Sequence, residues 1–394
     1  MMRILTALTY YRPHYSGLTV YAERLARALA AHGHAVTVLT ARYDRALPPR
    51  EQRDGVQIVR LGVLARVSKG VLLPSMPYWL WRYARQADLV HLHLPQLDAA
   101  PAALIARLLG KPVVLTYHCD LRLPDGLIHT LANQVSNRAN ALTARLANLI
   151  VANSLDYAEN SAFLRRYLGK LHAIPPPVEL PPVSAEDMAA FRQKAGIHPG
   201  QRLIGMAARL ASEKGVEHLV QAVTQLLARY PTARVLYQGQ YQNVLGEEAY
   251  ARRLAPLIEQ LGEHWTFLGN LSPVEMSAFF RLCEVPVLPS LNSTESWGMV
   301  QVESMRCGTP VVVSDLPGVR MPVKLTGMGR IVPPADAAAL AEAIGDVLDH
   351  PQQYQGDAET VRRQFSAEQI AAQYEALFQK LLGGGDTSAA HPGS

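Results

Sequence analysis

Two carboxylates eight positions apart stand in the segment PSLNSTESWGMVQVESMRCGTPVVVSD. Glu295 is expected in a polar loop, and Glu303 inside a helix predicted over 299–307 that ends at Gly308. A loop carboxylate beside an anion site can accept hydrogen bonds from sugar hydroxyls. Two ordinary structural roles are also possible: Glu295 could be an acid near a helix N-terminus, and Glu303 an acid on a helix surface. The whole segment indicates a ligand-binding site more specifically than either acid does alone.

The predicted start of this helix is itself a candidate anion site. Trp297 and Gly298 precede it, so the backbone N–H groups of Gly298, Met299 and Val300 have no partner inside the helix. Such groups, with the helix dipole, bind anions. The sequence therefore predicts that phosphate could bind at this point.

Two cations frame a second turn, in GMAARLASEKG. Arg209 follows a predicted strand and Lys214 precedes a predicted helix, so both should project at the carboxyl end of a sheet. They can neutralise a diphosphate, or they can be two surface cations in a turn. The chain contains no Gly-x-Gly-x-x-Gly, no P-loop motif and no Asp-x-Asp. We therefore expect a diphosphate to be held by protein cations, with no metal ion and no cofactor.

The elements that must position these residues alternate between strand and helix. Strands are expected at 3–8, 35–40, 57–61, 89–92, 113–117 and 149–152, and again at 203–207, 233–238, 265–268, 285–289 and 310–314. Helical patterns lie between them, for example 19–32, 98–109, 215–229 and 247–261. This alternation predicts parallel sheets covered by helices on both faces. The proline-rich stretch 175–182 interrupts it and indicates a domain boundary.

In these features the chain resembles the retaining glycosyltransferases of family 4, which have the GT-B fold. The matching marks are RPHYSGLTVYAERLARAL around Gly17, TYHCD around His118, RLASEKG, and the Glu-x7-Glu segment followed by CGTPVV. The resemblance covers nearly the whole chain. Two departures are Ser16-Gly17 in place of the usual Gly-Gly, and Trp297 in place of the usual Phe.

The resemblance implies a fold class and a domain order. The fold would be α/β, with two Rossmann-like, doubly wound, parallel-sheet domains facing a central cleft. An acceptor-binding domain would span 1–174, a linker 175–184 and a nucleotide-sugar donor domain 185–365. A helix at 366–382 would return to the N-terminal domain, and 383–394 would be a disordered tail.

The resemblance also implies roles for single residues. Arg209 and Lys214 would bind the donor diphosphate, Glu295 the sugar hydroxyls and Glu303 the ribose hydroxyls. His118 would contact the sugar near the reacting carbon. Further donor-binding positions would be Gly17, Leu271, Trp297, Gly298, Met299 and Val300. Tyr11, His14 and Asp120 would lie on the acceptor side, and we also expect that Asp120 could be purely structural.

The expected function is transfer of a sugar, with retention, from a nucleotide diphosphate sugar to a lipid-linked or glycan acceptor. UDP-linked and GDP-linked donors fit equally, with a slight preference for UDP. Two alternatives remain open: a nucleotide-sugar 2-epimerase of the same architecture, and a non-catalytic nucleotide-sugar binding protein. The Glu-x7-Glu segment disfavours the first, and the joint presence of Glu295, Arg209, Lys214 and His118 disfavours the second.

Charge is divided unequally along the 394 residues. Residues 1–182 hold 21 Lys+Arg and 11 Asp+Glu, giving +10, and the remainder carries −5. A basic half favours an anionic partner or is simply a solvated surface. Within it, 60–85 mixes arginines with Leu72, Leu73, Met76, Trp79 and Trp81, which suits an anionic membrane surface or an ordinary βα connection. No nucleic acid partner is expected.

Cysteine content bears on the compartment. Only three cysteines are present, at 119, 283 and 307, and they are far apart in the chain. They cannot form a disulfide framework, which favours a reducing compartment. We therefore expect a cytoplasmic protein, with peripheral contact to the inner face of the membrane.

Overall fold

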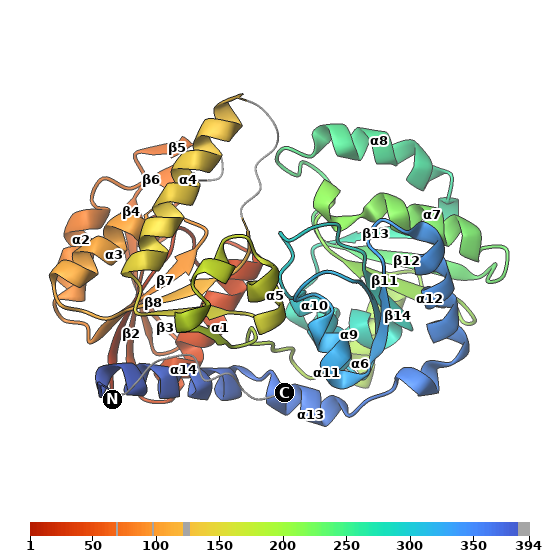
Figure 1. Ribbon diagram of the computed structural model, residues 1–394. Helices are drawn as coiled ribbons and strands as arrows, with labels where there is room; N and C mark the ends of the chain where they lie inside the picture. The colour runs from red at the N-terminus through yellow and green to blue at the C-terminus, as the bar shows by residue number, and fades with distance from the viewer. Residues whose placement is uncertain (68–69, 97, 121–126, 385–394) are drawn as a thin grey trace. The chain divides into compact units, whose positions relative to one another are not determined.

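Parallel β-sheets form the centre of both units into which the chain divides. The computed structural model describes residues 1–67, 70–96, 98–120 and 127–384 (Figure 1). Unit 1 comprises Met1–Pro177 together with the segment from Phe365 to the end, and unit 2 comprises Val178–Gln364. The predicted tail lies outside the described residues beyond position 384.

Unit 1 is built on a sheet of order β10-β9-β8-β7-β1-β2-β4-β3. Neighbouring strands are parallel except β3 and β4, which pair antiparallel at the edge. Central strands such as LVHLHL in β7 are buried at every position, as expected for a sheet covered on both faces. The strands are β1 Arg3–Ala7, β2 Ala35–Arg42, β3 Arg50–Arg53, β4 Val56–Gly62, β7 Leu89–Leu94, β8 Val113–Tyr117, β9 Leu149–Ala152 and β10 Leu171–Ala173, with a separate hairpin of β5 Ala65–Val67 and β6 Gly70–Leu72.

Helices cover both faces of this sheet. One core cluster joins the sheet to α2 Met76–Ala84, α3 Ala99–Leu108, α4 Leu127–Leu146 and α5 Leu155–Asn160. A second cluster joins the opposite face to α1 Gly17–Ala31 and α14 Ala367–Leu382. The C-terminal helix α14 therefore completes the core of unit 1, beside α1 (Figure 1).

A buried polar chain lies beneath α14. The hydroxyl of Tyr374 is 2.7 Å from that of Tyr21 on α1 and 2.7 Å from that of Thr116 on β8. Thr116 Oγ1 lies 2.8 Å from Nε2 of His91. These hydrogen bonds satisfy polar groups in the core and fix α14 against both α1 and the sheet.

Unit 2 has a six-stranded parallel sheet of order β13-β12-β11-β14-β15-β16. Its strands are β11 Arg202–Ala207, β12 Ala233–Gln238, β13 Trp265–Gly269, β14 Val285–Leu288, β15 Val311–Ser314 and β16 Gly329–Val332. One core cluster joins α7 Val216–Leu226, α8 Glu248–Glu259 and α12 Ala337–Asp349 to the sheet, and another joins α6 Ala185–Lys194 and α9 Pro273–Leu282. The remaining α-helices are α10 Met299–Arg306, α11 Met321–Thr326 and α13 Ala358–Gln364.

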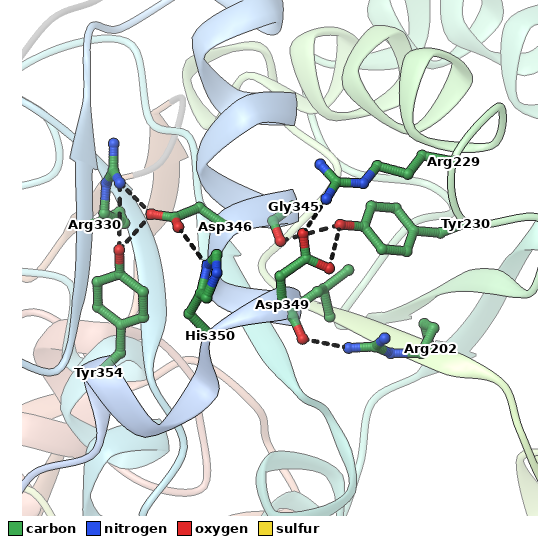
Figure 2. A network of polar contacts seen from close by, with 10 residues as sticks. Arg202, Arg229, Tyr230, Arg330, Gly345, Asp346, Asp349, His350 and Tyr354 are labelled. Atoms are coloured by element: carbon green, nitrogen blue, oxygen red, sulfur yellow. Dashed lines mark hydrogen bonds and ion pairs between the residues drawn. The ribbon is translucent and has the colours of Figure 1, made fainter.

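The C-terminal end of α12 is fixed by two groups of polar contacts (Figure 2). Asp346 accepts hydrogen bonds from Tyr354 and His350 and pairs with Arg330 of β16. The hydrogen bond from Tyr354, followed by those from His350 and Arg330, lowers the pKa of Asp346 below its ordinary value. One turn on, Asp349 pairs with Arg229 and accepts from the hydroxyl of Tyr230 at 2.8 Å.

The predicted α/β fold class is confirmed, and most predicted strands agree with the structure to within two residues. Five short strands were not predicted: β3, β10, β16, β5 and β6. Edge strands of three or four residues carry too few alternating positions to show a pattern. The prediction that the sheets are parallel is wrong at one edge of the unit 1 sheet, where β3 pairs with β4 in the antiparallel direction.

The segment 60–85 corrects one expectation. The Arg60 side chain is only 2% exposed and pairs with Glu51 at 2.7 Å, so it cannot meet a membrane. Leu73 and Met76 are buried in the core, 3% and 4% exposed. Lys69 lies outside the described residues. Only part of this segment, including Leu72 at 51% exposed and Trp81 at 43%, is available at the surface.

The buried histidines predict how stability depends on pH. Burial lowers the pKa of His91 to about 3, against about 6.5 in an unfolded chain. Between these values the unfolded state binds the extra proton, so stability falls as pH drops below about 6.5. Each such residue contributes a slope of about 1.4 kcal/mol per pH unit. We expect His91→Gln to reduce the slope by about that amount between pH 5 and 6.

Denaturant unfolding at several pH values measures this slope. His198→Gln, which changes an exposed histidine, is the matched control and should leave the slope unchanged. An unaltered slope in His91→Gln would mean that His91 is not held neutral in the folded protein.

Candidate functional site

The candidate site of unit 2 lies where the strand order reverses. From β11 the chain continues to β12 on one side, whereas β14 pairs with β11 on the other side. In open parallel sheets, the loops that follow two such strands diverge and leave room for a ligand at the carboxyl edge. The loop after β11 carries Arg209 and Lys214, and the loop after β14 carries Glu295.

These two loops are directly connected. The backbone N–H of Leu291 donates to the carbonyl of Glu213 at 2.9 Å. Gly215, the N-cap residue directly before α7, has φ +66°, and a Cβ there would lie 2.1 Å from the carbonyl oxygen of Pro289. Only glycine permits so close an approach. The sequence thus places the two loops side by side through one residue without a side chain.

Lys214 and Glu295, two of the predicted site residues, form an ion pair. Lys214 Nζ lies 2.7 Å from Glu295 Oε2, and both side chains are less than one-fifth exposed. A partly buried pair of this kind is weakly screened by solvent. Each group neutralises the other, so an arriving anion would take over Lys214 and leave the Glu295 carboxylate available to hydroxyl donors.

Arg209 is held in a similar way by an acid that the sequence analysis missed. Its Nη2 lies 3.0 Å from Glu213 Oε1, and its side chain is 48% exposed. The other nitrogens of its guanidinium can face a ligand. Glu247 was missed as well: its Oε2 accepts from the backbone N–H of Ser212 at 3.0 Å. Glu213 lies in a short 3-10 helix and Glu247 directly precedes α8, and acids are common at such positions, so no sequence pattern distinguishes them.

The N-terminus of α10 begins beyond Glu295, as predicted. Gly298 has φ +78° at the N-cap, and a Cβ there would meet Leu288 Cδ2 at 2.3 Å. No side chain caps this end of α10, and Met299 and Val300 provide its first backbone N–H groups. Trp297 is 3% exposed, so it forms part of the packed wall behind the loop.

A buried glutamine fixes this helix start. Gln301 is 1% exposed, and its side-chain nitrogen donates to the carbonyls of Trp297 and Val319, the latter at 2.8 Å. Gln301 was not among the predicted site residues, although a glutamine in the first turn of a buried helix is a recognisable signal. Glu303, two residues further along α10, is 8% exposed, and Leu271 follows β13 and is partly buried.

His118 lies in unit 1, directly after β8, and is 9% exposed. Its Nε2 is 2.9 Å from Nδ1 of His93, and the two rings are stacked with centroids 5.1 Å apart. Burial lowers the pKa of His118 to about 3. This imidazole is therefore neutral at physiological pH and can only act as a neutral hydrogen-bonding group.

The other predicted residues of unit 1 differ in their surroundings. Gly17 is the first residue of α1, and Ser16 caps that helix by accepting from the N–H of Thr19 at 3.2 Å. Tyr11 is 3% exposed within the core. His14 is partly buried, and its ring stacks on Tyr10 with centroids 4.5 Å apart.

Asp120 is held within unit 1 by three hydrogen bonds. Its carboxylate accepts from the hydroxyls of Tyr117 at 2.8 Å and Ser161 at 2.7 Å, and its backbone N–H donates to Tyr157 at 2.7 Å. These bonds fix the position of Asp120 relative to β8 and α5.

Two further features bear on the chemistry. Among the residues that the structure describes, no group of three His, Cys, Asp or Glu side chains is arranged to hold a metal ion. Within the same described part of the chain, every helix is too short or too polar to cross a lipid bilayer.

Two family matches identify the class of protein as a glycosyltransferase. The family described as Glycosyl transferases group 1 matches residues 187–364, and the family described as Glycosyl transferase 4-like domain matches residues 16–177. Together these matches span most of both units. The chain belongs to the family 4-like glycosyltransferases with the GT-B fold, which confirms the family and the fold expected from the sequence.

Known relatives and solved structures agree with this assignment. The chain is 29% identical to the D-inositol 3-phosphate glycosyltransferase of Xylanimonas cellulosilytica, over 84% of this chain and 83% of that one. It is 27% identical to the 2-deoxystreptamine N-acetyl-D-glucosaminyltransferase of Streptomyces fradiae, over 86% and 84%. The structure of Anabaena HepE with UDP and glucose superposes with a TM-score of 0.77 at 21% identity, covering 96% of this chain and all of the other.

Gln301 provides a test of how the site is supported. We expect Gln301→Leu to lower the free energy of unfolding by about 2 kcal/mol, because two buried carbonyls lose their donor. Denaturant unfolding measures the change. Gln193→Leu makes the same substitution at an exposed position of α6 and should have little effect. Equal stability of both variants would show that the two carbonyls do not depend on Gln301.

Proposed function

We propose that this protein is a retaining glycosyltransferase that moves a sugar from a nucleotide diphosphate donor to a hydroxyl of its acceptor. The observation that carries the proposal is the placement of Arg209 and Lys214 on one loop and Glu295 on the adjacent loop, at the point where the strand order reverses. Unit 2 would bind the donor, and unit 1 the acceptor. Donor binding would also use Glu303, Leu271, Gly17 and the start of α10.

The chemistry of the bond that breaks supports these roles. Cleavage between the anomeric carbon and the phosphate leaves an oxocarbenium-like sugar and a diphosphate with added negative charge. Arg209, Lys214 and the N-terminus of α10 would stabilise that charge where it develops. A departing phosphate that takes the acceptor's proton on the same face of the sugar would give retention without a carboxylate nucleophile. His118 would contact the donor sugar as a neutral imidazole.

We favour uracil as the base of the donor, which would then be a UDP-sugar. This choice is supported by the fold shared with HepE, whose structures contain UDP and UDP-glucose. For the acceptor we propose a lipid-linked or glycan hydroxyl. The second candidate is a small phosphorylated polyol, because the relatives of 24% to 29% identity include several named for D-inositol 3-phosphate. We infer a cytoplasmic location.

A screen of nucleotide sugars tests the function as a whole. The matching donor should stabilise the protein against heat and undergo slow hydrolysis to the free sugar and the nucleoside diphosphate. Formation of an isomeric nucleotide sugar would instead indicate an epimerase. Stabilisation without any turnover, with every acceptor tried, would indicate a binding protein.

Glu295 should be needed for turnover, because it is placed to hold hydroxyls of the donor sugar. We expect Glu295→Gln to lower kcat by at least about tenfold, which corresponds to roughly 1.4 kcal/mol of transition-state stabilisation. Rates of donor hydrolysis or transfer measure this effect. Glu342→Gln, at an exposed position of α12, should retain the wild-type rate. Wild-type turnover in Glu295→Gln would refute the role proposed for this residue.

Arg209 and Lys214 should act on the leaving diphosphate in place of a metal ion. We therefore expect activity to persist in excess EDTA and to fall severely in Arg209→Ala. Arg252→Ala removes an exposed cation from α8 and serves as the control. Loss of activity in EDTA that is complete, and is restored by a divalent ion, would contradict this mechanism.

A further inference from the structure

Helices α2, α3 and α4 lie side by side on one face of the sheet of unit 1 (Figure 1). Their inner sides are packed into the core, with Leu80 on α2, Ala103 on α3 and Ala144 on α4 each at most 1% exposed. Their outer sides form one continuous layer. The composition of that layer is unlike that of a solvated helical surface.

The first unusual property is the amount of apolar surface. Of the thirteen large hydrophobic side chains that are exposed among the described residues, five lie on these three helices. They are Tyr78 at 55% and Trp81 at 43% on α2, Leu104 at 46% and Leu108 at 77% on α3, and Leu142 at 44% on α4. Apolar side chains that gather on one face mark an interaction surface.

The second property is the sign of the charge. None of the residues of α2, α3 and α4 is Asp or Glu, whereas Arg82, Arg107, Arg138 and Arg145 lie on them and Arg85 follows α2 directly. Acids of neighbouring segments are partly buried, paired or lie further along the chain: Asp98 directly precedes α3 and is partly buried, Asp88 pairs with Arg3, and Asp156 and Glu159 are on α5. The arginines of these three helices therefore have no acidic residue beside them on the same helices.

We propose that the outer face of α2, α3 and α4 binds an anionic lipid bilayer. Tyr and Trp side chains place their rings at the headgroup level, and arginines beside them meet lipid phosphates. The Arg85 guanidinium already lies 4.7 Å from the centroid of the Trp81 ring. Cations distributed over three helices without an acid match a surface that is uniformly negative, and a lipid bilayer is such a surface.

This surface replaces the one expected from the sequence. The segment 60–85 contributes only α2 and Arg85 to this surface. The rest comes from α3 and α4, neither of which shows a membrane-binding pattern in its own sequence. The proposal stands apart from the transferase chemistry, because none of these side chains is among the residues proposed to bind the donor. Its failure and the failure of the proposed function can therefore be told apart.

Co-sedimentation with vesicles tests the proposal. The full chain should pellet with vesicles of phosphatidylcholine containing 30% phosphatidylglycerol at low salt, and more weakly as salt is raised to a few tenths molar. It should remain in the supernatant with phosphatidylcholine alone. Absence of pelleting with the anionic vesicles, or pelleting that is independent of salt and of anionic lipid, would overturn the proposal.

Charge reversal locates the surface. We expect Arg85→Glu with Arg138→Glu to weaken binding to the anionic vesicles by at least tenfold. The matched control is Arg192→Glu with Arg252→Glu, which makes the same change in net charge at exposed positions of α6 and α8. Both variants should unfold at the wild-type temperature and bind UDP as the wild type does. Equal loss of vesicle binding in both variants would show that only net charge matters, and would overturn the assignment to this face.

Trp81 gives a direct readout of contact. Lipids brominated on the acyl chains should quench its fluorescence in the wild type, and quenching should be lost in Trp81→Phe while pelleting persists. Quenching that is unchanged in Trp81→Phe would place another part of the protein in the bilayer. Dimerisation that Leu108→Ser abolishes would identify the face as an interface between copies of the chain, and would also overturn the proposal.

Discussion

Contact between the loops after β11 and β14 is the constraint on which the candidate site depends. Gly215 has no side chain, so the turn that carries Lys214 can lie against the carbonyl of Pro289. That approach places Lys214 within 2.7 Å of Glu295, although 81 residues separate them in the chain. The sheet supplies the two loops at one edge, and a single glycine decides whether they meet. Any larger residue at 215 would separate the groups that are proposed to share the donor.

The pairing of Lys214 with Glu295 also affects how a ligand can bind. A site that presented an unpaired lysine would attract any anion, and one that presented an unpaired carboxylate would repel them all. Paired, the two groups cancel at short range and respond only to a ligand that can satisfy both. A diphosphate joined to a sugar has an anionic part for the lysine and hydroxyl donors for the carboxylate. Under the proposed function, the ion pair would therefore favour the whole donor over its fragments.

Alternating strands and helices, and most of their bounds, could be predicted because buried parallel strands such as VVLTY and LIVA are apolar throughout. The positions of Arg209, Lys214, Glu295 and the start of α10 followed from that alternation. Long-range partners could not be predicted: Glu213 beside Arg209, Gln301 beneath the loop, and His93 against His118 depend on side-chain directions. The burial of Arg60 was also invisible, because its partner Glu51 lies on an edge strand too short to show a pattern.

Unit 1 takes its last helix from the far end of the chain, and this has a consequence during synthesis. Tyr21 and Tyr374 are 353 positions apart, yet their hydroxyls share one buried hydrogen bond. While the ribosome is still translating, Tyr21, Leu25 and Leu29 of α1 have no α14 to cover them, whereas unit 2 is already complete in sequence by Gln364. Unit 1, whose first helix is synthesised early, is thus the second unit to finish folding. A nascent chain must keep this apolar face from aggregating until α14 emerges.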